Sequence, residues 1–182
     1  NTGDRQADGE IKTSHTLAST LETYTDGNKQ FLSCTLPWAR NSVYASVEAA
    51  YRTKKFFARG EYVMKHIGKK SGKGLPDNTF HGGYAEAGYM IFGQGYKYNR
   101  AESVVSGLGG RGLEVSARYS YLNLNDGGAE GGSMHSATVG GAIGFNKFFQ
   151  VMLEYSYSRL ANSHFPLDKN IHIVQARMMF SF

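Results

Sequence analysis

The fold is decided by the closing stretch Asn170-Ile171-His172-Ile173-Val174-Gln175-Ala176-Arg177-Met178-Met179-Phe180-Ser181-Phe182. From position 174 the even residues are apolar, whereas the odd residues between them are mostly polar. Because side chains alternate across a β-strand, this pattern predicts a strand with one apolar and one polar face. A strand that ends on an aromatic residue is typical of a barrel whose outer side meets lipid. Phe180 and Phe182 are therefore predicted to act in membrane assembly.

The same alternation recurs along most of the chain before this stretch. Strands of this kind are predicted at residues 43–52, 56–66, 80–93, 112–124, 134–145 and 148–160, with a weaker candidate at 15–25. With the final stretch they make eight strands, and roughly 9–11 tilted residues are enough to cross a bilayer. No sustained helical period is present, and turn signals predict that part of 27–41 is a loop.

The connections between the predicted strands differ between the two ends of the sheet. If neighbouring strands pair antiparallel, one end carries the connections 53–55, 99–111 and 146–147, two of which are very short. The other end carries four longer connections, at 27–41, 68–79, 125–132 and 161–169. Outer-membrane barrels have short periplasmic turns and longer extracellular loops, so this asymmetry favours that architecture.

Aromatic residues on the apolar face gather near both ends of the predicted strands. Those near the short turns are Tyr51, Phe56, Phe145, Phe149 and Phe182, and those near the long connections are Tyr121 and Tyr157. Aromatic side chains mark the two membrane–water interfaces of a barrel, and smaller apolar residues lie between them. The distribution therefore indicates two aromatic girdles, one at each interface.

The polar face of the predicted strands carries nearly all of their charge. Its charged residues are Glu48, Arg52, Arg59, Glu61, Glu86, Glu114, Arg118, Glu154 and Arg177. The alternative is a soluble β-sandwich or barrel, which would turn its polar face to water and guard its edges with Pro or Lys. The sequence favours an all-β fold, an antiparallel up-and-down transmembrane β-barrel with these nine residues facing the lumen. Their mixed signs fit either a selectivity device or a self-neutralising network.

Length and composition fit one barrel domain. Of the 182 residues, 1–14 are predicted to be a polar tail or loop and 15–182 to supply the barrel strands. Abundant Gly (23), Tyr (12) and Phe (11) suit a barrel, and Cys34 has no second cysteine with which to form a disulfide. The first ten residues lack an apolar signal core, so either a signal peptide has been removed or the sequence begins inside a longer chain.

Several stretches resemble the phosphate-selective porin O and P family. The most specific is 113–126, which contains Arg118-Tyr119-Ser120-Tyr121-Leu122; Gly60-Glu61-Tyr62, residues 84–93 and residues 173–182 are also similar. The resemblance covers roughly residues 42–182. It implies a porin of about twice this length that forms sixteen-stranded trimeric channels, of which this chain matches the carboxy-terminal half. The anion-binding arginines of the family lie mainly in the other half, so none is carried over to a residue here.

These observations predict an outer-membrane porin-like barrel in a Gram-negative bacterium, through which small solutes diffuse passively, with anions such as phosphate as candidates. The alternative is a closed eight-stranded barrel without a channel, serving as a structural or surface-interaction protein. Small inward residues such as Ser116 and Ser156 favour a wider pore, because a filled eight-stranded interior would need more bulk. Expected partners are outer-membrane lipid, lipopolysaccharide, small solutes and either a homotrimer or a larger envelope assembly, without nucleic acid.

The remaining polar residues give no pattern of catalysis or metal binding. Lys65, Lys69, Lys70 and Lys73 predict a basic outer loop that either attracts anions and lipopolysaccharide or is simply solvated. The six histidines, His15, His66, His81, His135, His164 and His172, lack metal-ligand spacing. Neither a nucleophile elbow nor a phosphate-binding glycine loop is present. The chain is therefore expected to be no enzyme and to need neither metal nor cofactor.

Overall fold

A computed structural model describes residues 4–5, 11–12, 15–19, 32–36, 39–69, 77–99, 104–161 and 169–182. The strands before the main sheet are β1 (Asp4–Arg5), β2 (Ile11–Lys12), β3 (His15–Ser19) and β4 (Leu32–Leu36). The remainder are β5 (Ala39–Arg52), β6 (Phe56–Lys69), β7 (Asn78–Phe92), β8 (Lys97–Asn99), β9 (Val104–Ser106), β10 (Gly112–Asp126), β11 (Ala129–Gly144), β12 (Phe149–Ala161) and β13 (Lys169–Phe180). Within the described ranges, no helix is long and apolar enough to cross a membrane.

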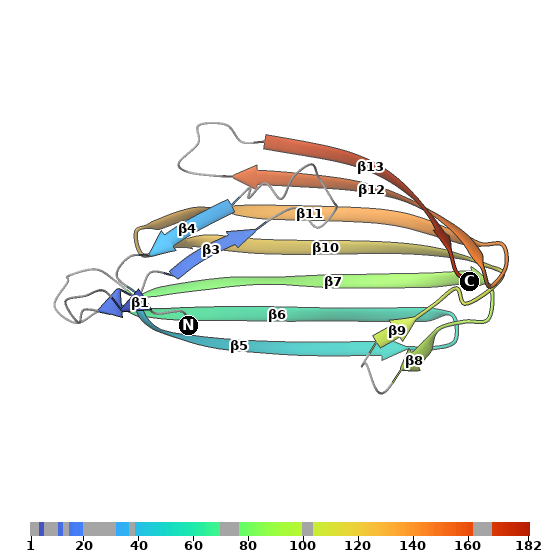
Figure 1. Ribbon diagram of the computed structural model, residues 1–182, viewed down its shortest axis with the longest axis horizontal. Helices are drawn as coiled ribbons and strands as arrows, with labels where there is room; N and C mark the ends of the chain where they lie inside the picture. Colours follow the sequence, from blue (N-terminus) through green and yellow to red (C-terminus); the bar gives the residue numbers. More distant parts are fainter. Residues whose placement is uncertain are drawn as a thin grey trace.

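Seven long strands form one antiparallel sheet in the order β13-β12-β11-β10-β7-β6-β5 (Figure 1). Each strand pairs with its neighbour along the chain, except that β7 pairs with β10 because β8 and β9 form a small hairpin of their own. This arrangement confirms the predicted all-β, antiparallel, up-and-down fold. The sheet is not closed among the described residues, since β5 and β13 each have a neighbour on one side only.

The predicted first strand does not join this sheet. Instead of running over 15–25 beside β5, the described part of it is β3, which pairs antiparallel with β4. The range 27–41, predicted to be partly loop, contains β4 and the start of β5. The prediction was wrong here because alternation fixes the two faces of a strand but not its pairing partner, which depends on distant residues.

The register of the seven strands defines two faces. The inner face is the one against which β4 packs, through contacts with β11 and β10. On it, Ala50, Arg59, Glu86, Arg118 and Thr138 lie directly opposite one another across five strands. The next row, on the outer face, is Tyr51, Ala58, Ala87, Ala117, Val139 and Tyr155. Predicted alternation and observed register therefore agree along the sheet.

Side chains that lie beneath β4 form the larger apolar cluster of the molecule's described part. Leu32, Cys34 and Leu36 alternate on the buried side of β4 and pack against residues such as Leu124 and Met134 on the inner face. Gly131 permits this close approach, because a Cβ there would lie 2.8 Å from the Cβ of Cys34 and 2.6 Å from that of Leu124. The hairpin β3–β4 thus covers part of the inner face.

The two ends of the sheet differ, although not in every connection as predicted. The loop predicted at 125–132 is instead the two-residue turn Gly127-Gly128, because β10 runs to Asp126 and β11 begins at Ala129. Two tight turns lie at one end: the backbone N–H of Thr53 donates to the carbonyl of Phe56 over 2.7 Å, and Oδ1 of Asn146 accepts from the N–H of Phe148 over 2.8 Å. We call this the short-turn end. The connections at the opposite end include residues 70–76 and 162–168, and we call it the long-loop end. Figure 1 places the C-terminus at the short-turn end.

Candidate functional site

The nine charged residues predicted to face a lumen all lie on the inner face of the sheet. The cross-strand pairs that place them there are Glu48–Glu61, Arg52–Phe57, Arg59–Glu86, Glu86–Arg118, Met90–Glu114, Gly140–Glu154 and Met152–Arg177. The pairs connect in a continuous register from β5 to β13, so one surface carries five carboxylates and four guanidinium groups. Their contact with a water-filled lumen stays a prediction.

Three of these residues meet at the centre of the inner face. Glu86 on β7 accepts hydrogen bonds from Nε and Nη2 of Arg59 on β6, over 3.0 and 2.9 Å. On the other side, Nη1 of Arg118 on β10 donates to the same carboxylate oxygen over 3.4 Å. The side chain of Glu86 is 16% exposed, and each arginine side chain is about twice as exposed. One carboxylate therefore neutralises one of two flanking guanidinium groups, which leaves the cluster with a positive charge.

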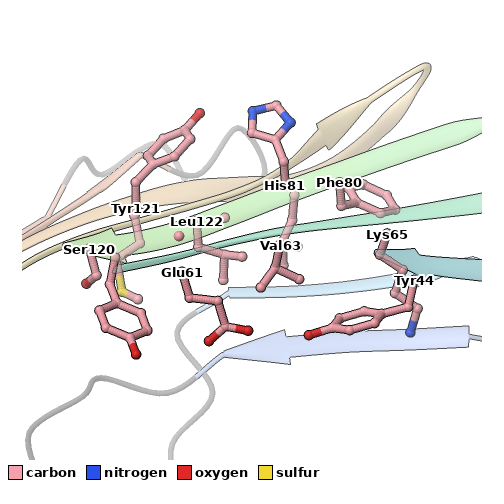
Figure 2. Close-up of a pocket in the computed structure, with 14 residues that line it drawn as sticks. Tyr44, Glu61, Val63, Lys65, Phe80, His81, Ser120, Tyr121 and Leu122 are labelled. Atoms are coloured by element: carbon pink, nitrogen blue, oxygen red, sulfur yellow. The ribbon is translucent and has the colours of Figure 1, made fainter. Parts of the chain in front are cut away.

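A cavity of about 370 Å³ adjoins this cluster on the side of the long-loop end. Tyr84 links the two, because the guanidinium of Arg118 lies 4.0 Å from the centre of its ring, a cation–π contact. Apolar residues of β6, β7 and β10 make much of the wall, and Glu61 adds a carboxylate. Figure 2 shows Glu61 and Tyr44 on one side of the sheet and His81 on the other. The inner face therefore offers apolar as well as charged surface to a solute.

The connection after β7 folds back over the inner face at the short-turn end. Tyr96 is 4% exposed and packs its ring edge-on against Phe57 at 4.8 Å between ring centres. Its backbone N–H donates to the carbonyl of Lys54 over 2.9 Å, and its carbonyl accepts from Nη1 of Arg52 over 3.1 Å. Burial and the nearby carboxylate of Glu114 raise the pKa of the Tyr96 hydroxyl. No local pattern predicts this inward fold, because it depends on contacts with distant strands.

The outer face is apolar between two bands of aromatic side chains. At the short-turn end the rings of Phe145, Phe149 and Phe180 stack, with centres 5.3 and 4.8 Å apart. At the long-loop end, tyrosines of β10 and β12 contact histidines of β11 and β13, an arrangement that the histidine spacing alone did not reveal. Large apolar side chains between the bands, such as Val139 and Val174, are more than half exposed. This surface fits lipid and not water.

The other predicted site residues fall in different surroundings. Lys65 and Lys69 belong to β6 and not to a basic outer loop, because pairing with Ala39, Asn41 and Asn78 extends the strand as far as Lys69. Lys65 lines the cavity, and Lys70 and Lys73 lie outside the described residues. Phe182 follows the end of β13 and is fully exposed. Its role in assembly and that of Phe180 stay predictions.

The described histidine, cysteine and acidic side chains form no group of three or more that could hold a metal ion. Cys34 is 7% exposed within the apolar cluster beneath β4, and burial raises the pKa of its thiol.

Comparison with known proteins agrees with this geometry. The family model described as "Phosphate-selective porin O and P" matches residues 1–182. A protein of Caulobacter vibrioides described as uncharacterized is 30% identical over 112 residues, which is 58% of this chain and 22% of that protein. The chain thus corresponds to a small part of that relative's length. No solved structure matches the chain.

Proposed function

Because this chain belongs to the phosphate-selective porin O and P family, we propose that it forms part of the wall of a water-filled channel in the bacterial outer membrane. In this proposal small solutes diffuse passively along the inner face, and the chain is no enzyme. The outer face, apolar between two aromatic bands, meets lipid. The inner face, with its nine charged side chains, meets water and the passing solute.

The cluster of Arg59, Glu86 and Arg118 is the observation that carries this proposal. The three side chains lie at one level across adjacent strands and remain partly exposed. Removing these three charged side chains from water in a dry interior would cost free energy. At the wall of an aqueous pore they stay hydrated and act on the ions that pass. Because two guanidinium groups flank one carboxylate, the cluster favours anions at this level. Phosphate belongs to that class, and we propose it as a candidate permeant.

Strand number supports a barrel wider than this sheet alone. In an antiparallel sheet of seven strands, β5 and β13 run in the same direction. Direct closure between them would require a parallel pair, whereas bacterial single-chain barrels have an even number of antiparallel strands. The closed eight-stranded alternative needs one more strand between β5 and β13, and the strand predicted for that place pairs with β4 instead. We therefore favour a larger barrel completed by further strands, within a homotrimer or another envelope assembly.

Ion selectivity in planar bilayers tests this proposal with a matched pair of variants. The full mature protein is expected to give ohmic conductance with a mild preference for anions. Arg118→Gln removes a positive charge from the cluster and should shift the reversal potential in a salt gradient toward cations. Glu86→Gln removes the negative charge from the same level and should shift it toward anions.

Two results would contradict the channel. One is the absence of conductance from protein whose heat-modifiable migration shows a folded barrel. The other is an equal reversal potential for wild type and both variants, which would mean that ions do not pass this surface. Ser156→Ala, on the same face but without charge, is the control for nonspecific effects of substitution.

A further inference from the structure

Two strand pairs carry the same constellation of tyrosines and histidine on the outer face. Tyr119-Ser120-Tyr121 on β10 lies beside His135 of β11, and Tyr155-Ser156-Tyr157 on β12 lies beside His172 of β13. In each pair the second tyrosine is directly opposite the histidine, with ring centres 4.7 and 5.0 Å apart. The first tyrosine reaches diagonally, and its hydroxyl lies 2.7 or 2.8 Å from Nδ1 of the histidine. The molecule thus repeats one side-chain unit on successive hairpins.

This repeated unit leaves the other ring nitrogen of each histidine for a further partner. When the tyrosine hydroxyl donates to Nδ1, the neutral imidazole carries its proton on Nε2. His135 and His172 are both exposed, as are Tyr119 and Tyr155. Each unit can therefore present an N–H donor away from the sheet.

Arg159 lies between the two units. It is exposed on β12 and directly opposite His135 on one side and Asn170 on the other. His172 is two residues from Asn170 on β13, so Arg159 is directly opposite one histidine and diagonal to the other. At the outward register positions of the seven sheet strands there is one acidic residue, Glu130, which pairs with Asn125 near the tip of the β10–β11 hairpin. We call His135, Arg159, His172, Tyr119 and Tyr155 the Tyr–His–Arg patch.

The location of the Tyr–His–Arg patch determines which class of molecule can reach it. It lies toward the long-loop end, on the face whose next residues along the strands are Val139, Leu153 and Val174. A solute in the lumen cannot reach this face, whereas a lipid headgroup at the outer interface can. A guanidinium and two N–H donors suit a phosphate, with which arginine forms charge-assisted hydrogen bonds. The tyrosine rings and the apolar residues beside them suit the acyl chains of the same molecule.

We propose that the Tyr–His–Arg patch binds the phosphate of an anionic glycolipid in the outer leaflet, of the lipid A type. The inference rests on the proposed placement of the barrel in the outer membrane. His81 extends the aromatic band, since its ring lies 5.9 Å from that of Tyr121 and 6.4 Å from that of Tyr62. The patch holds the one arginine of the outward register positions, which makes it the centre of phosphate recognition.

Native mass spectrometry of the full mature protein, titrated with lipid A in detergent, tests this proposal. The matched ligand is the same lipid after enzymatic dephosphorylation, which should bind more weakly to the wild type. Arg159→Gln should weaken binding of phosphorylated lipid A about fivefold, the effect of one cation at an anionic headgroup. The triple variant Arg159→Gln, His135→Gln and His172→Gln should bind phosphorylated lipid A more weakly than Arg159→Gln alone. The double variant Tyr119→Phe and Tyr155→Phe keeps the aromatic rings but removes the hydroxyls that contact the histidines, and it should also weaken binding.

Arg177→Gln is the matched control, because it removes the same charge from the inner face of β13 and should leave lipid binding unchanged. Equal affinity of wild type for the two forms of the lipid would overturn the proposal, as would an Arg159→Gln protein that is folded and binds normally. Loss of dimers or trimers on Arg159→Gln without loss of lipid would assign the patch to a second copy instead. Conductance distinguishes the two proposals: lipid binding without conductance overturns only the channel, and conductance without phosphate-dependent lipid binding overturns only this site.

Discussion

Val139 represents the residues of the outer face, where 54% of its side chain is exposed between Ala117 and Tyr155. Val139→Arg should lower the free energy of unfolding by about 2–4 kcal/mol if the residue lies near the bilayer midplane, because lipid does not solvate a guanidinium. Reversible denaturant unfolding in lipid vesicles measures the change. Val139→Leu should stay close to wild type, and a water-facing Val139 would tolerate both substitutions equally.

Cys34 is a residue whose chemistry is set by its surroundings. Burial beneath β4 raises the pKa of its thiol, so less of the reactive thiolate is present at a given pH than for an exposed cysteine. Alkylation by iodoacetamide at pH 8 should therefore be slow in the folded protein and fast after denaturation. Mass spectrometry of the modified chain follows both reactions, and similar rates in the two states would contradict the buried position.

For single residues, the sequence predicted on which face of the sheet a side chain lies, but not which residues of other strands it contacts. Alternation placed Glu86 and Arg118 on one face correctly, because the period of a strand is a local property. The shared contact of Glu86 with Arg59, and the pairing of Tyr119 with His135, depend on which residues of other strands stand opposite. The register depends on the pairing of all the strands in the sheet, so the sequence of one strand could not predict either contact.

The hairpin β3–β4 is the element with the largest difference between prediction and structure. Its docking depends on Gly131, which leaves room for Cys34 and Leu124. Gly131→Val should displace β4 from the inner face, because a Cβ closer than 3.0 Å to its neighbours forces them to move. Faster alkylation of Cys34 and a larger single-channel conductance are the expected results.

Gly109 offers a comparison for this variant, since a Cβ at that position meets no atom within 4 Å. Gly109→Ala should change neither the reactivity of Cys34 nor the conductance. If Gly131→Val leaves Cys34 as slow to react as in wild type, then β4 is held by contacts other than those seen at Gly131. Alternation predicted where the seven long strands lie, but β5, β6 and β11 extend further toward the long-loop end than predicted. The hairpin could not be predicted, because its strands alternate in the same way as strands of the sheet.

At the scale of the whole molecule, β5 and β13 present edges that a membrane does not tolerate. Lipid provides no hydrogen bonds, and each unpaired backbone group there costs several kcal/mol. In the full mature protein in a membrane, the amides of β5 and β13 should therefore be protected from hydrogen exchange about as well as those of β10. Mass spectrometry of peptides from a nanodisc sample measures this protection. Rapid exchange confined to the two edge strands would contradict closure by further strands.

The alternation of faces along the long strands has a consequence for how such a gene can change. Loss of one codon within β11 would turn every later side chain of that strand to the opposite face, so Val139 and its neighbours would exchange lipid for the lumen. Loss of two codons would preserve the faces and shift only the partners. Insertions and deletions inherited within strands should therefore come in pairs of codons, whereas connections at the long-loop end can vary by single codons. Homologous sequences should therefore differ in strand length by even numbers of residues.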